Sequence, residues 1–314
     1  MVELSMAADR ARIPRHRRVA NTPRMRLMAR DYQVILAVRE YRVLRTDQIQ
    51  RLFFSSRNTA NYRLQRLYQH GFLERRWRAV EYGQGMGQAV YLLGKRGADL
   101  VLRKSPKHIR VSGWRKASHA VRSPFLDHTL LVNDVRIAFA LAARHAGYDV
   151  EKWAREDELK ATREYVYTST ASGVRRKMAI IPDAYFALNL GDRRAHFLLE
   201  VDRATETNSR WSQRVQAYLA YVASGQYARR FGTTSLRILV VTTSPERLGS
   251  LKRATERVGG HSLFWLTTLD RASPEAILGQ TIWYVSGQQE ASPLISNPSQ
   301  GMPGHRLETS SPKL

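Results

Sequence analysis

The sequence predicts an α+β protein, with a helical N-terminal domain that ends in a β-hairpin and an α/β second domain built on a mixed sheet. Three observations predict this fold class. Apolar side chains recur at helical spacing over residues 31–69, two strand-like segments flank a glycine-rich loop in residues 72–93, and helical and strand-like segments alternate over residues 125–266. A chain of 314 residues can form two domains with separate cores.

Positive charge is concentrated in the first part of the chain. The net charge is +24, and residues 1–125 carry 27 Lys and Arg against 8 Asp and Glu, whereas residues 126–314 carry 24 against 19. Such an excess is expected on a surface that displaces counterions from a phosphate backbone. An anionic membrane would attract the same charge, but no amphipathic apolar face accompanies the arginine-rich start. We therefore expect double-stranded DNA as the partner, and no membrane.

Several function classes are excluded by what the sequence lacks. It has no cysteine, which excludes disulfides, thiolate zinc sites and cysteine nucleophiles and fits a cytoplasmic location. No apolar run approaches the roughly 20 residues that cross a bilayer, and no apolar segment of a signal peptide follows the N-terminal arginines. No phosphate-binding loop of the ATPase type is present, and no His-x-His pair points to a histidine-metal nickase.

Residues 1–28 are predicted to be a basic flexible arm. Arginines follow one another here, interrupted by Pro14 and Pro23. Such an arm can follow a phosphate backbone or enter a minor groove, and it can equally be a solubilising tail. The sequence leaves these two roles open.

The next elements are predicted to be two helices that share one core. Over residues 31–41 the apolar Val34, Ile35 and Val38 fall on one helical face. Thr46 is placed to cap a second, short helix that ends near residue 53.

A third helix and a β-hairpin complete this domain. Ser56 can cap the third helix, which runs to about residue 69 before Gly71 ends it. Residues 72–77 and 89–93 are predicted strands on either side of the loop 83–87. This order is typical of a winged helix-turn-helix, and a short fourth helix, 94–104, would close a DNA-binding domain of residues 29–104.

One face of the third helix carries the side chains that recognise bases in a major groove. Arginine pairs with guanine, and Asn or Gln pairs with adenine. With two arginines of the first predicted wing strand, the candidate DNA-binding residues are Arg57, Asn58, Asn61, Tyr62, Gln65, Arg66, Arg75 and Arg76. Gln69 lies on the same predicted face, whereas Ala60, Leu64 and Leu67 are predicted to point into the core.

A basic linker, residues 105–124, is predicted to lead to an α/β domain of residues 125–285. From residue 286 the chain is rich in Ser, Pro, Gly and Gln, and we expect residues 286–314 to be disordered. The predicted elements of the second domain are a helix at 128–145, strands at 148–153, 178–188 and 195–201, a helix at 209–224, a strand at 236–242, a helix at 246–258 and a strand at 263–266.

Three carboxylates fall near the ends of two of these strands. Glu200 and Asp202 alternate along one strand and are predicted to share a face, and Asp183 follows the apolar start of the preceding one. Such a cluster is stable when a cation neutralises it, and Mg²⁺ or Mn²⁺ prefers oxygen ligands. These three residues are therefore candidate catalytic and metal-binding groups. Ion pairing, such as Asp202 with Arg203, is the alternative.

This order of carboxylates on strands before a helix resembles the PD-(D/E)XK nuclease fold. The resemblance implies that Asp183 and Glu200 are metal ligands, with Glu156 or Glu158 as a further one. The chain departs from the pattern at Asp202, where that family has Lys. Candidates for the missing positive charge are Arg203, Arg210 and Arg214. The predicted helix also lacks the Gln-x-x-x-Tyr spacing of one nuclease branch, because Gln213 and Gln216 are out of step with Tyr218.

Over about residues 28–270 the chain resembles the bacterial replication-relaxation family, which is associated with plasmids and integrative elements. The stretches that carry the resemblance are Arg30–Leu36, Thr46–Phe54, Arg63–Leu73, His128–Asp134, Pro182–Asp183 and Glu200–Glu206. The resemblance implies a DNA-binding protein that acts in the replication or relaxation of mobile DNA.

Two further functions stay open at this point. The alternative is a Mg²⁺-dependent endonuclease that nicks or cuts the DNA selected by the winged helix, and a plain transcription regulator is a third hypothesis. A second copy of the chain and replication or conjugation proteins are candidate further partners. Neither the DNA target nor the oligomeric state follows from the sequence.

Overall fold

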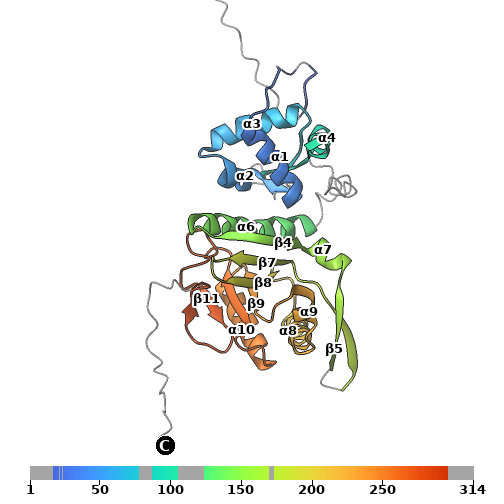
Figure 1. The fold of residues 1–314 in the computed structure, drawn as a ribbon, viewed down its shortest axis with the longest axis vertical. Coiled ribbons are helices and arrows are strands. Elements are labelled where there is room, and N and C mark those ends of the chain that lie inside the picture. Colours follow the sequence, from blue (N-terminus) through green and yellow to red (C-terminus); the bar gives the residue numbers. More distant parts are fainter. Residues whose placement is uncertain are drawn as a thin grey trace, which may run out of the picture. The chain divides into compact units, whose positions relative to one another are not determined.

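A computed structural model describes most of the chain, and its residues fall into two compact units, unit 1 (Met1–Asp134) and unit 2 (Val135–Leu314) (Figure 1). Among the described residues, no helix combines the length and apolar composition that crossing a bilayer requires. Predictions for most of the arm, the wing loop 83–86, the linker 105–123 and the tail from 296 lie outside the described residues. The described residues are 17–20, 22, 24–77, 87–104, 124–169 and 173–295.

Unit 1 has the predicted order of helices and strands. Its sheet runs β1-β3-β2 with antiparallel neighbours, so the last two strands form the hairpin that follows the third helix. This order and pairing agree with a winged helix-turn-helix. The elements are α1 (Ala29–Tyr41), β1 (Leu44–Arg45), α2 (Thr46–Phe53), α3 (Arg57–Gln69), β2 (Leu73–Trp77), β3 (Ala89–Leu93) and α4 (Lys95–Lys104).

The ends of α3 are set by the two residues predicted for them. The Ser56 hydroxyl accepts a hydrogen bond from the Thr59 amide at 3.2 Å, and Gly71 has a left-handed φ of 73° directly after the helix. The start of α2 differs from the prediction. Thr46 is the first helical residue rather than the cap, and its hydroxyl lies 3.4 Å from the carbonyl oxygen of Ala89 on β3.

A buried ion pair joins α1 to α3 inside unit 1. Asp31 is 1% exposed, and Arg63 donates to it through Nε at 3.0 Å and through a second guanidinium nitrogen. Around this pair the predicted apolar face is confirmed, because Val34, Leu64 and Leu67 are fully buried. Arg63, like Leu64 and Leu67, therefore lies on the inward side of α3.

Unit 1 extends into the first half of α6 (Pro124–His145). Leu126 and Leu130 belong to a buried cluster with Val43 of unit 1, and the Asn133 amide donates to the carbonyl of Val43 at 2.7 Å. Asp134 accepts hydrogen bonds from Arg45 at the start of α2. The boundary between the units therefore lies later than the predicted residue 125, because these contacts join the start of the helix to unit 1.

Unit 2 alternates strands and helices, as predicted, and it holds more elements than the sequence indicates. After α6 they are β4 (Asp149–Arg155), α7 (Glu156–Ala161), β5 (Glu164–Ser169), β6 (Arg175–Ile180), β7 (Ala184–Asn189), β8 (Arg194–Val201), α8 (Asn208–Ala223), α9 (Gln226–Phe231), β9 (Arg237–Thr242), α10 (Pro245–Arg257), β10 (Phe264–Thr268), β11 (Trp283–Val285) and β12 (Ala291–Ser292).

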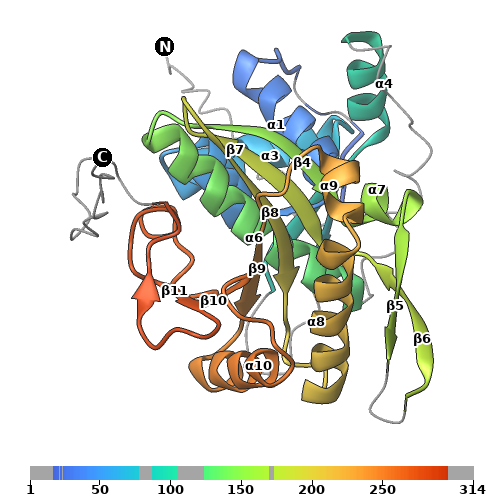
Figure 2. The same cartoon turned by 60° about the horizontal axis from the view of Figure 1, so that its bottom comes forward.

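The described strands of unit 2 form a mixed sheet, which confirms the prediction. Its order is β12-β11-β10-β9-β8-β7-β4, and β5 and β6 form a separate two-stranded ribbon. Within it β4, β7 and β8 are antiparallel neighbours, whereas β8, β9 and β10 are parallel (Figure 2). This part of unit 2 has the order expected of a PD-(D/E)XK-like fold. A helix is followed by three antiparallel strands, then by a second helix and by a strand parallel to the third of those strands.

The two faces of the sheet of unit 2 are covered by different helices. Phe186 and Phe197 point to the face that holds Phe139 of α6, with ring centroids 4.7 and 6.3 Å from it. Tyr185 and Leu198, the next residues along the same strands, belong to the buried cluster that α8 and α10 complete. Because Glu200 lies two residues after Leu198, it points to the α8 face as well.

Two predictions for unit 2 are wrong in part. Residues 178–188 form two strands of different sheets rather than one, because Pro182 and Asp183 interrupt the run. Residues 286–295 are not disordered: β12 pairs with β11, and Leu294 is 1% exposed. The carbonyl of Leu294 accepts a hydrogen bond from Arg237 at 2.6 Å. The segment is otherwise polar, and it is held by this bond, by the pairing of β12 with β11 and by the buried side chains of Leu294 and Ile295.

Candidate functional site

The outward face of α3 carries the residues predicted to contact DNA. Arg57, Asn58 and Asn61 are exposed, and Tyr62 is 56% exposed. Gln65 and Arg66 are half-buried on the same face. These six side chains thus lie on one face of α3, with the first four exposed, and their contact with DNA stays a prediction.

Gln69 is the exception, because its side chain is buried. Its amide nitrogen donates to the carbonyl of Arg17 at 2.9 Å, and its amide oxygen accepts from the Val19 amide at 3.0 Å. Arg18 extends this contact by donating to the carbonyl of Tyr68 at 2.9 Å. The last part of the predicted arm thus lies against the C-terminal end of α3, and Gln69 is used to hold it there.

The two wing arginines differ in how much of their charge is accessible. Arg76 is exposed on β2. The Arg75 guanidinium lies 4.3 Å from the ring centroid of Tyr68 and 5.5 Å from that of Trp77, so it is held over aromatic faces. Arg76 is the better candidate for a phosphate contact, and Arg75 for ordering the hairpin against α3.

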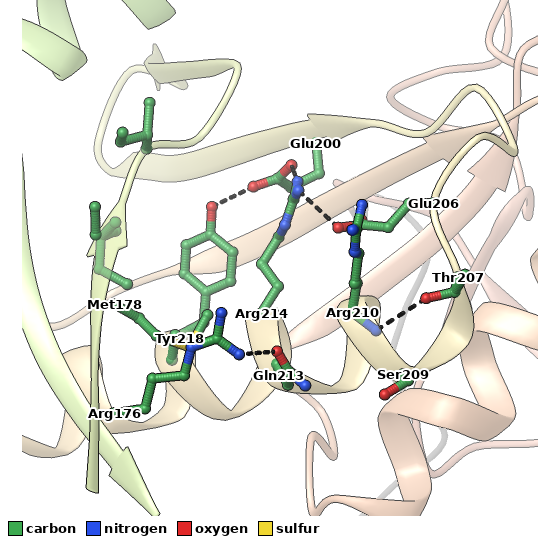
Figure 3. A pocket seen from close by; sticks show the side chains of 14 residues that line it. Arg176, Met178, Glu200, Glu206, Thr207, Ser209, Arg210, Gln213, Arg214 and Tyr218 are labelled. Carbon is green, nitrogen blue, oxygen red and sulfur yellow. Dashed lines mark hydrogen bonds and ion pairs between the residues drawn. The ribbon is translucent and has the colours of Figure 1, made fainter. Parts of the chain in front are cut away.

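In unit 2, Glu200 lies at the centre of a buried hydrogen-bond network (Figure 3). The side chain is 3% exposed, and its Oε2 accepts from Arg214 at 2.6 Å while its Oε1 accepts from the hydroxyl of Tyr218. Arg214 also donates to Glu206 at 3.1 Å. Both donors come from one face of α8, where Arg214 and Tyr218 are one helical turn apart.

Burial controls the ionisation of this network. It raises the pKa of Glu200 to about 7, with Arg214 opposing the rise and the nearby Asp183 adding to it. Glu200 in turn raises the pKa of Arg214, and burial followed by Glu200 raises the pKa of Tyr218 well above its usual value. Glu200 therefore gains or loses its proton near neutral pH, while Arg214 keeps its charge.

The structure brings Asp183 and Glu200 together, as predicted. Asp183 lies directly before β7, and its Oδ2 accepts from the amide of Val201 on β8 at 2.7 Å. This bond fixes the carboxylate beside the strand that carries Glu200. The two are neighbours because β7 and β8 are antiparallel and adjacent.

Asp202 belongs to a different network. Its two oxygens accept from Arg247 Nε at 2.8 Å and Nη2 at 2.9 Å, and Oδ2 also accepts from Thr242 at 2.8 Å. Burial alone would raise the pKa of Asp202, but the hydrogen bonds from Arg247 and Thr242 outweigh it and hold the pKa below its usual value. Ion pairing was the predicted alternative, and the partner is Arg247 of α10, 45 positions away, rather than the adjacent Arg203.

Glu156, the fourth predicted metal ligand, is exposed at the start of α7. Within the described residues, no three Asp, Glu or His side chains come together as metal ligands. A divalent cation at Glu200 would have to displace Arg214, and Asp202 is held by Arg247. The donor set as arranged therefore does not fit Mg²⁺ or Mn²⁺.

A cavity of about 770 Å³ opens beside this network, between α8 and the segment from β6 to β7. Arg176 from β6 donates to Gln213 of α8 at 2.9 Å across it (Figure 3). Arg210 and Arg214 supply two further positive charges, and Glu200 and Glu206 supply the negative ones. The sequence did contain a signal for this site, because an Arg-x-x-x-Tyr spacing places Arg214 and Tyr218 on one helical face.

Comparisons with known proteins identify the family. Residues 36–236 match the model of the replication-relaxation family. No curated protein matches the sequence. Among solved structures, the restriction endonuclease FokI is similar with a TM-score of 0.29 and 11% sequence identity, over 77% of this chain and 42% of that enzyme. The chain thus spans less than half of the length of FokI, and a similarity at this level supports no inference about activity.

Proposed function

This chain belongs to the replication-relaxation family, and from that premise we propose that it binds double-stranded DNA through α3 of a winged helix-turn-helix. The observation that carries the proposal is the exposed face of α3, where Arg57, Asn58 and Asn61 project from one side of a helix whose other side is buried. Such side chains match the donor and acceptor patterns of guanine and adenine in a major groove.

The charge distribution supports the same partner. The excess of Lys and Arg over Asp and Glu lies mainly in residues 1–125. Near α3 the acidic side chains Asp31 and Glu74 are paired with Arg63 and Arg18, so they do not oppose a phosphate backbone. The DNA is that of a plasmid or an integrative mobile element, and binding serves its replication or relaxation.

Two steps test this proposal. The full chain first selects its preferred duplex from a randomised pool, and its affinity for that duplex is then measured at one fixed salt concentration. Arg57→Ala is expected to weaken binding of the selected duplex by about 1–3 kcal/mol, because a base-contacting arginine contributes that much. Arg253→Ala, which removes an exposed arginine of α10 in unit 2, is the matched control and should leave the affinity unchanged. Unchanged affinity in both Arg57→Ala and Asn61→Ala would refute the assignment of α3.

The alternative, a Mg²⁺-dependent endonuclease, receives less support from the geometry. Arg214 already neutralises Glu200, and Arg247 already neutralises Asp202. A cleavage assay on supercoiled DNA with Mg²⁺ or Mn²⁺ decides between the two functions. We expect the wild type not to convert supercoiled DNA to the open-circular or linear form. If the wild type does convert it and Glu200→Ala does not, the protein is a metal-dependent endonuclease instead.

A further inference from the structure

The ribbon of β5 and β6 presents two differently composed faces. Alternation along the strands turns Val166 and Ile180 toward the buried cluster that contains α8. It turns Tyr165 and Tyr167 the other way, where they are 39% and 52% exposed. The ribbon lies beside α8 and is separate from the main sheet (Figure 2). Two large aromatic rings in solvent on one ribbon require an explanation, since packing within unit 2 does not use them.

Each of these rings is covered by a positively charged side chain from β6. The Lys177 ammonium lies 4.3 Å from the ring centroid of Tyr165, and the Arg175 guanidinium lies 4.1 Å from that of Tyr167. In the register of the ribbon Tyr167 is opposite Lys177, so each cation reaches its ring from a diagonal position. Arg163 adds a third cation by donating to the Tyr165 hydroxyl at 2.8 Å.

Among the described residues of the ribbon, no acidic side chain lies on this outer face. Within the described part of the ribbon, the acidic side chain is Glu164, and it belongs to the opposite face. Glu164 accepts there from the Tyr221 hydroxyl and from Arg230 at 3.2 Å. Beside the small residues Ala179 and Ser169, the outer face thus carries two aromatic rings and two cations, which are complementary to a ligand that has flat rings and a chain of anions.

We propose that this face, made of Tyr165, Tyr167, Arg175 and Lys177, binds single-stranded nucleic acid. The bases stack on the two tyrosine rings, and the two cations move from the rings to the phosphates that connect the bases. Surfaces that bind single strands without sequence preference combine the same two components, aromatic rings and a positively charged track.

The spacing of the rings favours a single strand over a duplex. Residues two positions apart on a strand are separated by about 7 Å, which is twice the roughly 3.4 Å rise of successive bases in a duplex. Bases on neighbouring rings are therefore drawn apart from each other, which an extended single strand permits. In a duplex the base faces are covered by their neighbours. The site belongs to unit 2, so it is additional to the duplex binding proposed for α3.

Fluorescence anisotropy of the full chain with labelled oligothymidylate tests the site. Tyr165→Ala/Tyr167→Ala is expected to weaken binding at least tenfold, since stacking on an aromatic side chain contributes about 1–3 kcal/mol per base and 1.4 kcal/mol is tenfold. Tyr165→Phe/Tyr167→Phe is the matched control and should bind within about twofold of the wild type, because the rings remain. Arg175→Gln/Lys177→Gln should bind more weakly and with a smaller dependence on salt.

Two further measurements separate this site from α3 and from misfolding. Arg57→Ala should keep its affinity for oligothymidylate while it loses affinity for duplex DNA, and the tyrosine variants should show the reverse. Thermal unfolding should be unchanged in the tyrosine variants, because the rings are exposed. Wild-type affinity in the double alanine variant would overturn the proposal. The proposal would also be overturned if the double alanine variant lost affinity for duplex and single-stranded DNA equally. A loss in the double phenylalanine variant as large as in the double alanine variant would have the same consequence.

Discussion

An arginine of α3 in unit 1 faces solvent, whereas two arginines of unit 2 pair with buried carboxylates. Arg57 is exposed, and Arg214 and Arg247 donate to Glu200 and Asp202 at distances of 2.6 to 2.9 Å. The same residue type therefore has two uses in one chain. An outward arginine keeps its hydration and its charge available for phosphates or bases. An arginine that pairs with a buried carboxylate gives up part of its hydration and is stabilised by that carboxylate.

This difference explains why Glu200 and Asp202 do not come together as metal ligands. In a site that binds a divalent cation, the cation balances the carboxylates. Here Arg214 and Arg247 provide the balancing charge from two separate helices, α8 and α10. The mixed sheet of unit 2 is thus combined with a network in which arginines balance the carboxylates.

The largest effect is expected from Asp202→Ala. Arg247 and Asp202 are 13% and 6% exposed, so the change leaves a largely buried guanidinium without its carboxylate. Breaking such a pair lowers the free energy of unfolding by about 3–5 kcal/mol. Urea unfolding of unit 2, followed by the fluorescence of its buried tryptophans, measures the loss.

The matched control for this change is Asp47→Ala in unit 1. Asp47 also pairs with an arginine, Arg45, but is 38% exposed, and we expect a loss of about 1 kcal/mol or less. A loss for Asp202→Ala as small as that for Asp47→Ala would show that the pairing of Arg247 with Asp202 does not stabilise unit 2. A stabilisation of the wild type by Mg²⁺ that Asp202→Ala removes would identify Asp202 as a metal ligand instead.

Glu200→Gln is expected to change how the stability of unit 2 depends on pH. The pKa of Glu200 is about 7 in the folded chain and 4.5 ordinarily, so between these values the folded state binds the proton and the unfolded state has lost it. The wild type should therefore lose on the order of 3 kcal/mol relative to the variant as pH rises from 4.5 to 7. Urea unfolding at several pH values measures the difference in stability between the wild type and the variant. If that difference stays constant, or grows in favour of the wild type as pH rises, the pKa of Glu200 is not raised in the folded chain.

The smallest effect is expected from Ser56→Ala, which changes unit 1 alone. Loss of the hydroxyl that accepts from the Thr59 amide should lower the stability of α3 by about 1 kcal/mol. Hydrogen exchange of the first amides of α3 should accelerate accordingly, while the amides of α8 in unit 2 keep their rates. Acceleration in both helices would show that the stabilities of the two units are coupled.

The helices and their buried faces could be predicted, and the contacts between distant segments could not. The apolar residues of α3 and α8 recur at helical spacing, and Ser56 and Gly71 mark the ends of α3, so these elements follow from local pattern. The ribbon β5–β6 escaped prediction because each of its strands fully buries a single side chain, Val166 or Ile180, which leaves little apolar pattern to detect. Gln69 was assigned to the wrong environment because its partners, Arg17 and Val19, are about 50 positions earlier.

The outward face of α3 was determined by the sequence alone, because helical periodicity is local and fixes which side chains share a face. The placement of Glu200 on a strand followed from the same kind of local pattern. The arginines that neutralise Glu200 and Asp202 could not be identified in this way, because Arg214 and Arg247 lie 14 and 45 positions after the residues they contact. The physical reason is that an ion pair depends on which helix packs on which face of the sheet, and that choice is made by the whole core rather than by any one segment.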